Sequence, residues 1–387
     1  MNTKSKILLT GGRAPVTLDL ARRFKHYGHE VYVAETINYH LCRYSNSVKK
    51  SFLVPSPAHY KSAYINELSS LIQKYNIDLL IPTCEEIFYI SSELEALSRL
   101  TKVMVDKINN LDLLHNKFSF NKLIENTEIS TPETMLVKSM VEYNELINAK
   151  QITYPHVLKP AYSRFASQTK FIFASENIKL DISEKRPWVA QAYISGKLIC
   201  TYSICHEGKI LANVFYENNY SAGENGAGIS FKRIENAVLF NWITQFVKSL
   251  NYTGQIAFDI IEANDRSLWP IECNPRSTSG IHLFSDSLNI PNVFLLNSPI
   301  GRSADTKRQP MLSLAMLVYI LPNLRSFKKF SAWIKCFLVG KDVIFRWGDP
   351  LPFVMQLFAV INFFKISRKQ NISLIEATTH DIEWNGD

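Results

Sequence analysis

The most constraining feature of this sequence is a hairpin pattern, GQIAFDIIEANDRSLWPIECN, at residues 254–274. Two apolar strands flank the four-residue loop NDRS, a loop length that is common in β-hairpins. If Ala263 pairs with Leu268, counting outward places Asp259 directly opposite Glu272. Directly opposed carboxylates repel each other and destabilise a sheet. The pattern therefore predicts a positively charged partner for this pair.

A third oxygen donor, Asn274, lies two residues beyond Glu272 and so faces the same side of its strand. Two carboxylates and an amide suit a hard divalent cation such as Mg²⁺, or Mn²⁺, bridged to phosphate. Arg276, just past the strand, can reach phosphate oxygens with its bidentate guanidinium. The alternative is a solvated hairpin face with exposed acids, but the apolar neighbours on both strands argue against it. We therefore predict a metal and polyphosphate site here.

Two lysines are candidates for the same phosphates. Lys159 ends the apolar run HVLK immediately before a proline, an unusual place for a surface lysine, and Lys117 lies on a predicted helix 42 residues earlier. Taken alone, each also fits a solvated side chain. The loop AYSRFASQTK that follows Lys159 carries hydroxyls, backbone amides and Arg164, and is a candidate phosphate lid.

The chain begins with a strand–turn–helix–strand pattern, KILLTGGRAPVTLDLARRFKHYGHEVYVAE. A parallel βαβ unit accounts for this pattern, and a doubly wound α/β domain accounts for residues 1–108. The turn lacks the full G-x-G-x-x-G fingerprint, so we favour a plain strand-to-helix turn over a dinucleotide site. Antiparallel α+β patterns follow over residues 109–190 and 191–300, and residues 301–387 are mainly helical in pattern.

Composition narrows the class of protein. The six cysteines show no CxxC pair and the N-terminal apolar run is too short for a signal peptide, which favours a cytoplasmic protein. The formal net charge is +8, and residues 301–387 hold 12 Lys and Arg against 7 Asp and Glu. Since no basic-aromatic motif is present, we expect no nucleic-acid partner. A homodimer is compatible with the sequence.

One segment of the tail, PFVMQLFAVINFFKISRK at residues 352–369, packs large apolar residues against a basic end. We favour a core helix that docks the tail onto the protein. The alternative is a helix that lies at a membrane interface.

Several motifs in order resemble the ATP-grasp superfamily, which includes D-alanine–D-alanine ligase, biotin carboxylase and carbamoyl phosphate synthetase. The resemblance covers residues 107–283 and rests on NK at 116–117, TPET, VLKPA, VAQAYISG, GQIAFDII and IECNPR. It implies an α/β chain in which an N-terminal Rossmann-like parallel sheet precedes an ATP-grasp module of two α+β subdomains. A helical C-terminal extension would follow.

The resemblance also assigns roles to individual residues. Lys117 and Lys159 correspond to the nucleotide-phosphate lysines, and Arg276 to the arginine that stabilises the transferred phosphoryl group. Asp259, Glu272 and Asn274 correspond to the magnesium ligands. The segment that resembles the adenine-binding hinge consists of Gln191, Ala192, Tyr193 and Ile194.

Three positions depart from the family pattern. Lys197 and Leu198 follow the hinge glycine where an acid commonly contacts the ribose, and the loop after Lys159 contains no glycine. Asn116 replaces the aspartate commonly found before the first lysine. Because the candidate metal triad is intact, we expect an active enzyme.

The activity that the resemblance implies is ATP-dependent ligation of a small-molecule carboxylate to an amine through an acyl phosphate. Substrate contacts are expected from the loops around Glu86 and around Lys232 and Arg233. Two alternatives remain open: carboxylation or small-molecule phosphorylation on the same fold, and a non-catalytic nucleotide-binding regulator. No biotin-bearing lysine segment is present, which counts against a complete biotin carboxylase.

Overall fold

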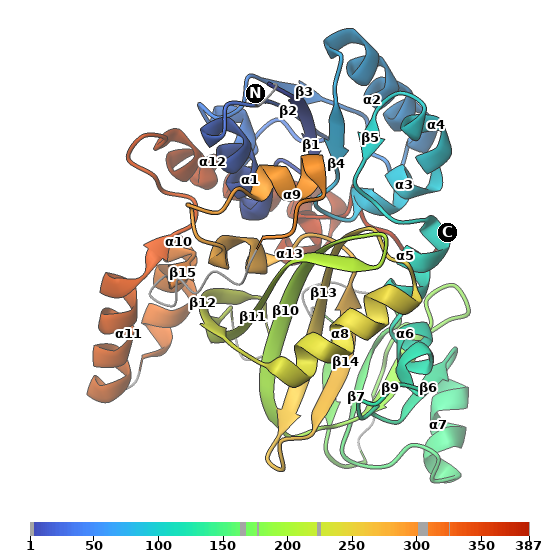
Figure 1. Ribbon diagram of the computed structural model, residues 1–387. Helices are drawn as coiled ribbons and strands as arrows, with labels where there is room; N and C mark the ends of the chain where they lie inside the picture. Colours follow the sequence, from blue (N-terminus) through green and yellow to red (C-terminus); the bar gives the residue numbers. More distant parts are fainter. Residues whose placement is uncertain are drawn as a thin grey trace.

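The computed structural model describes residues 4–162, 168–175, 178–222, 226–300, 309–324 and 326–386. The N-terminal part is a five-stranded parallel sheet, in the order β3-β2-β1-β4-β5 (Figure 1). Its central strand is fully buried from Ile7 to Leu9, as expected for a parallel strand covered on both faces. The strands are β1 (Lys6–Thr10), β2 (Glu30–Glu35), β3 (Lys50–Leu53), β4 (Leu79–Ile81) and β5 (Lys102–Val103).

The first helix follows a tight glycine turn and starts with Pro15 in its first turn, where a missing amide costs nothing. A Cβ on Gly11, whose φ is +71°, would lie 2.6 Å from the Thr83 hydroxyl, so the turn packs against its own sheet. The helices and 3-10 turn of this part are α1 (Pro15–His26), η1 (Leu41–Tyr44), α2 (Lys61–Tyr75), α3 (Glu86–Ser92), α4 (Leu94–Ser98) and α5 (Ile108–His115).

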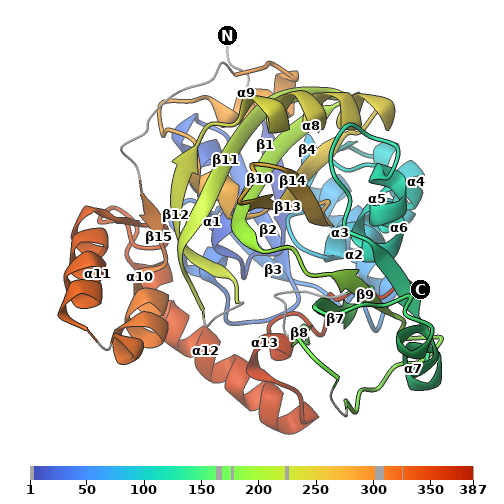
Figure 2. The ribbon, with the colours of Figure 1, turned by 90° about the horizontal axis from the view of Figure 1, so that it is seen from below.

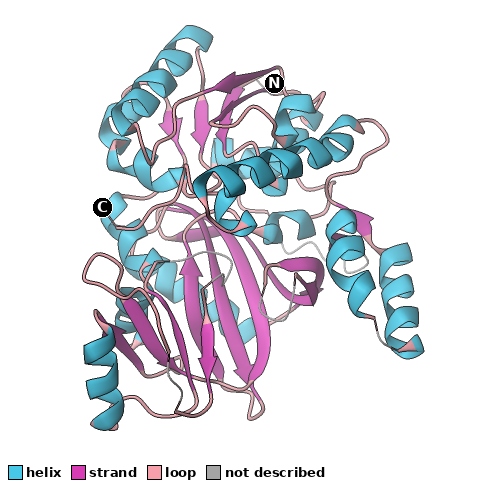
Figure 3. Cartoon of the chain, turned by 180° about the vertical axis from the view of Figure 1, so that it is seen from behind, coloured by secondary structure: helices cyan, strands magenta, loops and turns pink. Residues whose placement is uncertain are grey.

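The middle of the chain contains two antiparallel sheets. A four-stranded sheet in the order β6-β9-β7-β8 comprises β6 (Thr134–Val137), β7 (His156–Pro160), β8 (Lys170–Ile172) and β9 (Trp188–Ala192). The larger sheet has the order β14-β13-β10-β11-β12-β15-β16. Its long strands are β10 (Gly196–His206), β11 (Lys209–Ser221), β12 (Gly228–Ile234), β13 (Gly254–Ala263) and β14 (Leu268–Asn274). Figure 3 shows the two sheets lying next to each other below the parallel sheet. The associated helices are α6 (Lys117–Ile124), α7 (Met140–Asn148) and α8 (Ala237–Ser249).

The predicted hairpin is present, with one difference in register. Near the loop, Leu268 pairs with Glu262 and not with Ala263. An irregularity between Asp259 and Ile260 then shifts the ladder by one residue, so that Asp259 does pair with Glu272 as predicted. Pro270 lies in the shifted part, where its lack of an amide hydrogen suits an irregular edge strand.

The C-terminal part combines helices with two short strands that extend the larger sheet, β15 (Pro310–Met311) and β16 (Lys341–Asp342). Its helical elements are η2 (Ser279–Leu283), α9 (Ile290–Leu296), α10 (Ser313–Ala315), η3 (Met316–Ile320), η4 (Leu321–Asn323), α11 (Phe327–Val339), α12 (Leu351–Gln370) and α13 (Leu374–Ala377). In Figure 2, α11 and α12 lie at the outside of the molecule. The expectation of a core helix at residues 352–369 is wrong, because only 6% of the most apolar part of α12 is buried. Apolar composition alone did not reveal that α12 packs along one side only.

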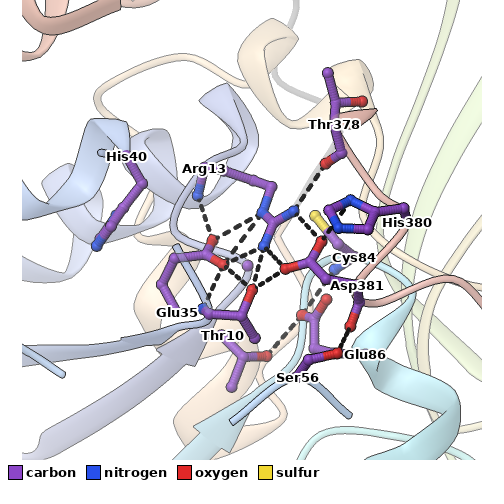
Figure 4. Close-up of polar contacts among 12 residues, drawn as sticks. Thr10, Arg13, Glu35, His40, Ser56, Cys84, Glu86, Thr378, His380 and Asp381 are labelled. Carbon is purple, nitrogen blue, oxygen red and sulfur yellow. Dashed lines mark hydrogen bonds and ion pairs between the residues drawn. The ribbon is translucent and has the colours of Figure 1, made fainter. Parts of the chain in front are cut away.

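The C-terminal tail returns to the N-terminal sheet and is held there by ion pairs (Figure 4). The Arg13 guanidinium contacts Glu35 at 2.6 Å and Asp381 at 2.7 Å, and all three side chains are buried. Thr36 hydrogen-bonds both Arg13 and Asp381. Glu35, at the end of β2, is therefore engaged within the protein. Trp384 stacks on Phe88, which anchors the end of the tail.

A second buried network joins the N-terminal helix α1 to η2. Asp19 contacts Arg23 at 2.6 Å and the His282 ring at 2.7 Å, and all three side chains are nearly inaccessible to solvent. Arg23 also donates to the Phe284 carbonyl at 2.8 Å. These contacts fix the parallel sheet against the end of the larger sheet.

We predict that Asp381→Asn destabilises the protein by about 2–3 kcal/mol at pH 7, because it removes one partner of a buried ion pair. Burial would raise the pKa of Asp381, but the attraction of Arg13 overrides this and lowers that pKa to about 2. The stabilisation is therefore complete above pH 4 and is lost as the pH falls from about 4 to 2. Urea unfolding of both proteins measures the difference.

The matched control is Asp181→Asn, which breaks the exposed pair between Asp181 and Arg186. It should leave the unfolding midpoint unchanged, since exposed pairs contribute little. Equal effects of the two substitutions would contradict this account of the tail.

Candidate active site

The three predicted metal ligands gather at the hairpin of β13 and β14. Asp259 lies directly opposite Glu272 in the ladder, and Asn274 Nδ2 lies 3.5 Å from Asp259 Oδ2. Asp259 and Glu272 are half-buried, and Asn274 is buried. The sheet therefore holds two carboxylates and an amide on one face, with limited access to water.

The burial of Asp259 and its closeness to Glu272 change the pKa of Asp259. Burial, followed by the repulsion of Glu272, raises the pKa of Asp259 to about 6. Arg276 and Lys159 act in the opposite direction without cancelling the effect. The site is therefore strained by negative charge when it is ionised and would gain from a bound cation.

The oxygen atoms of the two carboxylates and the amide at the hairpin suit a magnesium ion. Within the described residues, no cluster of three or more His, Cys, Asp or Glu side chains could hold a metal ion by itself. A cation at the hairpin would be held by Asp259, Glu272 and Asn274 and would complete its shell with water and phosphate oxygens. This open, oxygen-only environment is the one that Mg²⁺ favours when it binds with nucleotide phosphates.

Both predicted lysines point toward the hairpin. The Lys117 ammonium, at the start of α6, lies 3.7 Å from Glu272 Oε1 with only 1% of its side chain exposed. Asn116 caps this helix by accepting the amides of Phe118 and Ser119, at 3.0 and 3.1 Å. Asparagine is a strong N-cap, so its replacement of the usual aspartate preserves the helix start that positions Lys117.

Lys159, at the end of β7, is fixed by two hydrogen bonds. Its Nζ donates to Gln191 Oε1 at 3.0 Å and to the Ile271 carbonyl at 3.2 Å. Desolvation by burial lowers the pKa of Lys159 to about 8, although Glu272 opposes the shift. A cation held in this way interacts strongly with an incoming anion, because little water competes for it.

Arg276 lies next to the predicted metal ligands. Its Nη2 donates to Asn274 Oδ1 at 2.8 Å, and its backbone amide donates to the Asn274 carbonyl at 2.8 Å. Oδ1 has a second lone pair, so the same oxygen can still bind a cation. Arg276 therefore orients Asn274 and lies within reach of groups bound to it.

The hinge segment at the end of β9 is partly engaged already. Gln191 is buried, and its amide group joins Lys159 to the hydroxyl of Thr134 through bonds of 3.0 Å on each side. The amides of Ala192 and Tyr193 donate to the carbonyls of Glu133 and Pro155. A base bound at this segment would therefore use other backbone groups, such as the amide of Ile194. Arg164, the predicted lid residue, lies outside the described residues.

The predicted substrate residues occupy different environments. Arg233 pairs with Tyr216, and the row continues through Cys200 to Asp259 and Glu272. Arg233 therefore lies on the same face as the predicted metal ligands, with its backbone about 14 Å from that of Asp259. The neighbouring Lys232 is exposed and falls on the opposite face. Arg233 also pairs with Glu235 at 3.0 Å.

Glu86, the third predicted substrate residue, is buried under the glycine turn. Its Oε1 accepts hydrogen bonds from the Thr10 hydroxyl at 2.7 Å and from the amides of Thr83 and Cys84, both at 3.0 Å (Figure 4). These bonds hold the strand-end loop after β4 in place. A substrate role for Glu86, Lys232 or Arg233 stays a prediction.

The structure adds neighbours that the sequence did not reveal. Gln191 was assigned to adenine binding through its backbone, but its side chain also holds Lys159. Cys200 pairs with Asp259 across the sheet and fills the buried side of the site. The sequence signal for Gln191 was a polar residue near the end of an apolar strand. No local feature of the sequence indicates that Cys200 lies beside Asp259.

We predict that Asp259→Asn stabilises the metal-free protein in neutral solution. A raised carboxyl pKa makes ionisation unfavourable to folding, so the wild type loses stability as the pH rises from about 4 to 6. The variant should match the wild type near pH 4 and exceed it by up to about 3 kcal/mol above pH 7. Urea unfolding without metal at several pH values tests this.

Asp265→Asn, in the exposed loop of the same hairpin, is the control and should show no such gain at high pH. A wild type that is more stable than Asp259→Asn above pH 7 without metal would contradict the strained pair.

Comparison with known proteins gives an independent view of this site. The family model of the ATP-grasp domain matches residues 114–280. The large chain of carbamoyl phosphate synthase from Lachnoclostridium phytofermentans is 24% identical over 254 residues, which is 60% of this chain. The match spans only 24% of that relative.

Two solved structures share the fold. N5-carboxyaminoimidazole synthetase from Staphylococcus aureus, complexed with ADP, has a TM-score of 0.61 at 14% identity, covering 79% of this chain and 80% of the other. L-amino acid ligase from Bacillus licheniformis has a TM-score of 0.57 at 12% identity, covering 77% and 75%. The predicted fold, a parallel sheet followed by an ATP-grasp module and C-terminal helices, is thereby confirmed. Residues 114–280 match the ATP-grasp domain, and the chain as a whole shares the fold of these two enzymes.

Proposed function

We propose that this protein uses Mg²⁺ and ATP to activate a small-molecule carboxylate as an acyl phosphate, and then joins it to an amine. One observation carries the proposal: Asp259, Glu272 and Asn274 share one face, with Lys117, Lys159 and Arg276 around them. Anionic ligands for a cation lie beside cations for phosphate. Metal-bound polyphosphate satisfies both sets together.

The chain's own residues contribute positioning and charge. Lys117 and Lys159 would bind the nucleotide phosphates, and the segment at Gln191–Ile194 would hold the base. The bound ion would neutralise the phosphates and the two carboxylates. Arg276 would stabilise the negative charge on the phosphoryl group during its transfer.

The reaction balances without a protein nucleophile. A substrate carboxylate oxygen attacks the γ-phosphorus, the bond to the β–γ bridging oxygen breaks, and ADP leaves. The amine nitrogen then attacks the acyl carbon, inorganic phosphate departs, and the nitrogen loses a proton. Exclusion of water from the site during the reaction would protect the acyl phosphate from hydrolysis.

Two other outcomes use the same site. Carboxylation would replace the organic acid with bicarbonate, and a kinase reaction would replace it with a hydroxyl group. The relatives' names include a carboxyaminoimidazole synthetase, an amino acid ligase and a carbamoyl phosphate synthase, so the fold accommodates acceptors of several kinds. A nucleotide-binding regulator would bind ATP without turnover. A cytoplasmic location would suit any of these soluble-substrate reactions.

Trapping of the intermediate tests the proposal. Pools of carboxylic acids are incubated with the enzyme, Mg²⁺, ATP and hydroxylamine, and both ADP and hydroxamate are measured. Because hydroxylamine captures acyl phosphates, we expect hydroxamate in proportion to ADP for the pool that contains the substrate. ADP release that requires bicarbonate alone, or a hydroxyl acceptor, would replace ligation with one of the alternatives.

We also predict that Lys159→Ala raises the apparent KM for ATP by about 10- to 100-fold, which corresponds to the loss of one charge-assisted hydrogen bond. The control is Lys138→Ala, a largely exposed lysine that pairs with Glu184 away from the site. It should leave the KM unchanged. An unchanged KM in Lys159→Ala would remove this lysine from the phosphate site.

A further inference from the structure

The exposed apolar side chains of this protein are concentrated in one part of the chain. Among the described residues, 16 of the 26 exposed large hydrophobic side chains lie between Leu317 and Phe364. They include Phe327 and Leu338 on α11, at 87% and 78% exposure, and Trp347 before α12, at 90%. We call the outer side of η3, η4, α11 and α12 the C-terminal apolar surface. In Figure 1 both helices lie toward the left of the molecule, and in Figure 2 α11 lies at the left edge while α12 runs along the lower edge.

The helix α12 is the clearest case. It is 20 residues long with a mean hydropathy of 1.2 over its most apolar window, and is long and apolar enough to cross a membrane. Leu357, Ile361 and Phe364 are about half exposed, whereas one side of the helix contacts η1 and α13. A helix that is apolar on all sides is normally buried on all sides. The uncovered side therefore exposes to water an apolar surface that would normally be covered by protein or lipid.

Both ends of α12 are fastened to the N-terminal sheet domain. Just before the helix, Asp349 forms a buried ion pair with Arg22 at 2.9 Å. Beyond it, Asp381 forms the buried pair with Arg13. A helix that crossed a bilayer would have to break both ties and leave η1. The arrangement instead holds α12 along the surface of the protein, as in proteins that lie on one leaflet.

The charge around this surface selects the partner. Residues 309–370 contain nine basic residues: Arg325, Lys328, Lys329, Lys335, Lys341, Arg346, Lys365, Arg368 and Lys369. Their only acids are Asp342 and Asp349. Asp349 is buried with Arg22, and Asp342 accepts the amide of Ser313, so both are occupied within the fold. Lys328, Lys329, Lys365 and Arg368 are exposed.

We infer that the C-terminal apolar surface docks on an anionic lipid bilayer, with α12 lying in the interface. Apolar side chains would enter the boundary between headgroups and acyl chains, exposed lysines would contact anionic headgroups, and Trp347 would lie at headgroup depth. A second copy of the chain is disfavoured as the occupant, because two such surfaces would bring like charges together. The catalytic hairpin is a separate part of the molecule, so this inference stands apart from the proposed reaction.

Vesicle co-sedimentation of the full chain tests the inference. The vesicles are phosphatidylcholine alone, or phosphatidylcholine with about one third phosphatidylserine. We expect binding to the anionic vesicles that is at least ~10-fold tighter than to the neutral ones and that weakens as salt is raised. Equal binding to both, or binding to neither, would overturn the proposal.

Two pairs of substitutions assign the binding to this surface. Leu357→Glu with Ile361→Glu places charge on the exposed side of α12 and should weaken vesicle binding at least ~10-fold. The matched control is Leu53→Glu with Val238→Glu, at apolar positions that are 55% and 65% exposed elsewhere on the protein. It should bind like the wild type. Circular dichroism confirms that both variants fold.

Light scattering after size exclusion separates the lipid from a second copy. The proposal expects that the oligomeric state of the wild type is unchanged in Leu357→Glu with Ile361→Glu. It also expects that Lys328→Glu with Lys329→Glu reduces the preference for anionic vesicles in the co-sedimentation experiment. A wild-type dimer that the α12 variant converts to monomer, without vesicle binding by either form, would identify this surface as a subunit interface and overturn the proposal.

Discussion

The opposition of Asp259 and Glu272 is the constraint on which the candidate site depends. A β-ladder fixes both carboxylates on one face, and the half-buried setting raises the cost of two negative charges there. The surrounding elements supply the compensation. Lys117 comes from the start of α6, Lys159 from the end of β7 and Arg276 from the segment after β14. Three parts of the chain therefore place positive side chains around the two carboxylates of one hairpin.

Much of this arrangement could be predicted from the sequence, because it depends on local periodicity. Alternation along a strand gives the shared face of Glu272 and Asn274. Counting from a four-residue loop also predicted that Asp259 faces Glu272, but Leu268 pairs with Glu262, and the irregularity beside Asp259 restores the predicted facing. The ladder irregularity beside Asp259 could not be predicted, since it depends on how β14 accommodates Pro270. The hydrogen bonds that link Lys159 through Gln191 to Thr134 could not be predicted either, because they join strands that are distant in sequence.

The C-terminal segment shows the limit of composition as a guide. Its apolar residues favoured a core helix, yet burial depends on which neighbours cover a helix, and those are set by tertiary contacts. The ion pairs of Arg13 with Asp381 and of Arg22 with Asp349 position both ends of α12 and leave its outer side uncovered. Neither pair could be read from the sequence, because each joins residues more than 300 positions apart. The tail thus closes the N-terminal domain and presents an apolar surface at the same time.

The most direct test of the central claim is a calorimetric titration with a non-hydrolysable ATP analogue, with and without Mg²⁺. It compares the wild type with Glu272→Gln and with Glu262→Gln, a control on the same hairpin. The account predicts Mg²⁺-dependent binding in the wild type and the control, and binding at least ~10-fold weaker in Glu272→Gln, which lacks one carboxylate charge. Binding that is independent of Mg²⁺ and equal in all three proteins, or no binding by the wild type, would contradict it.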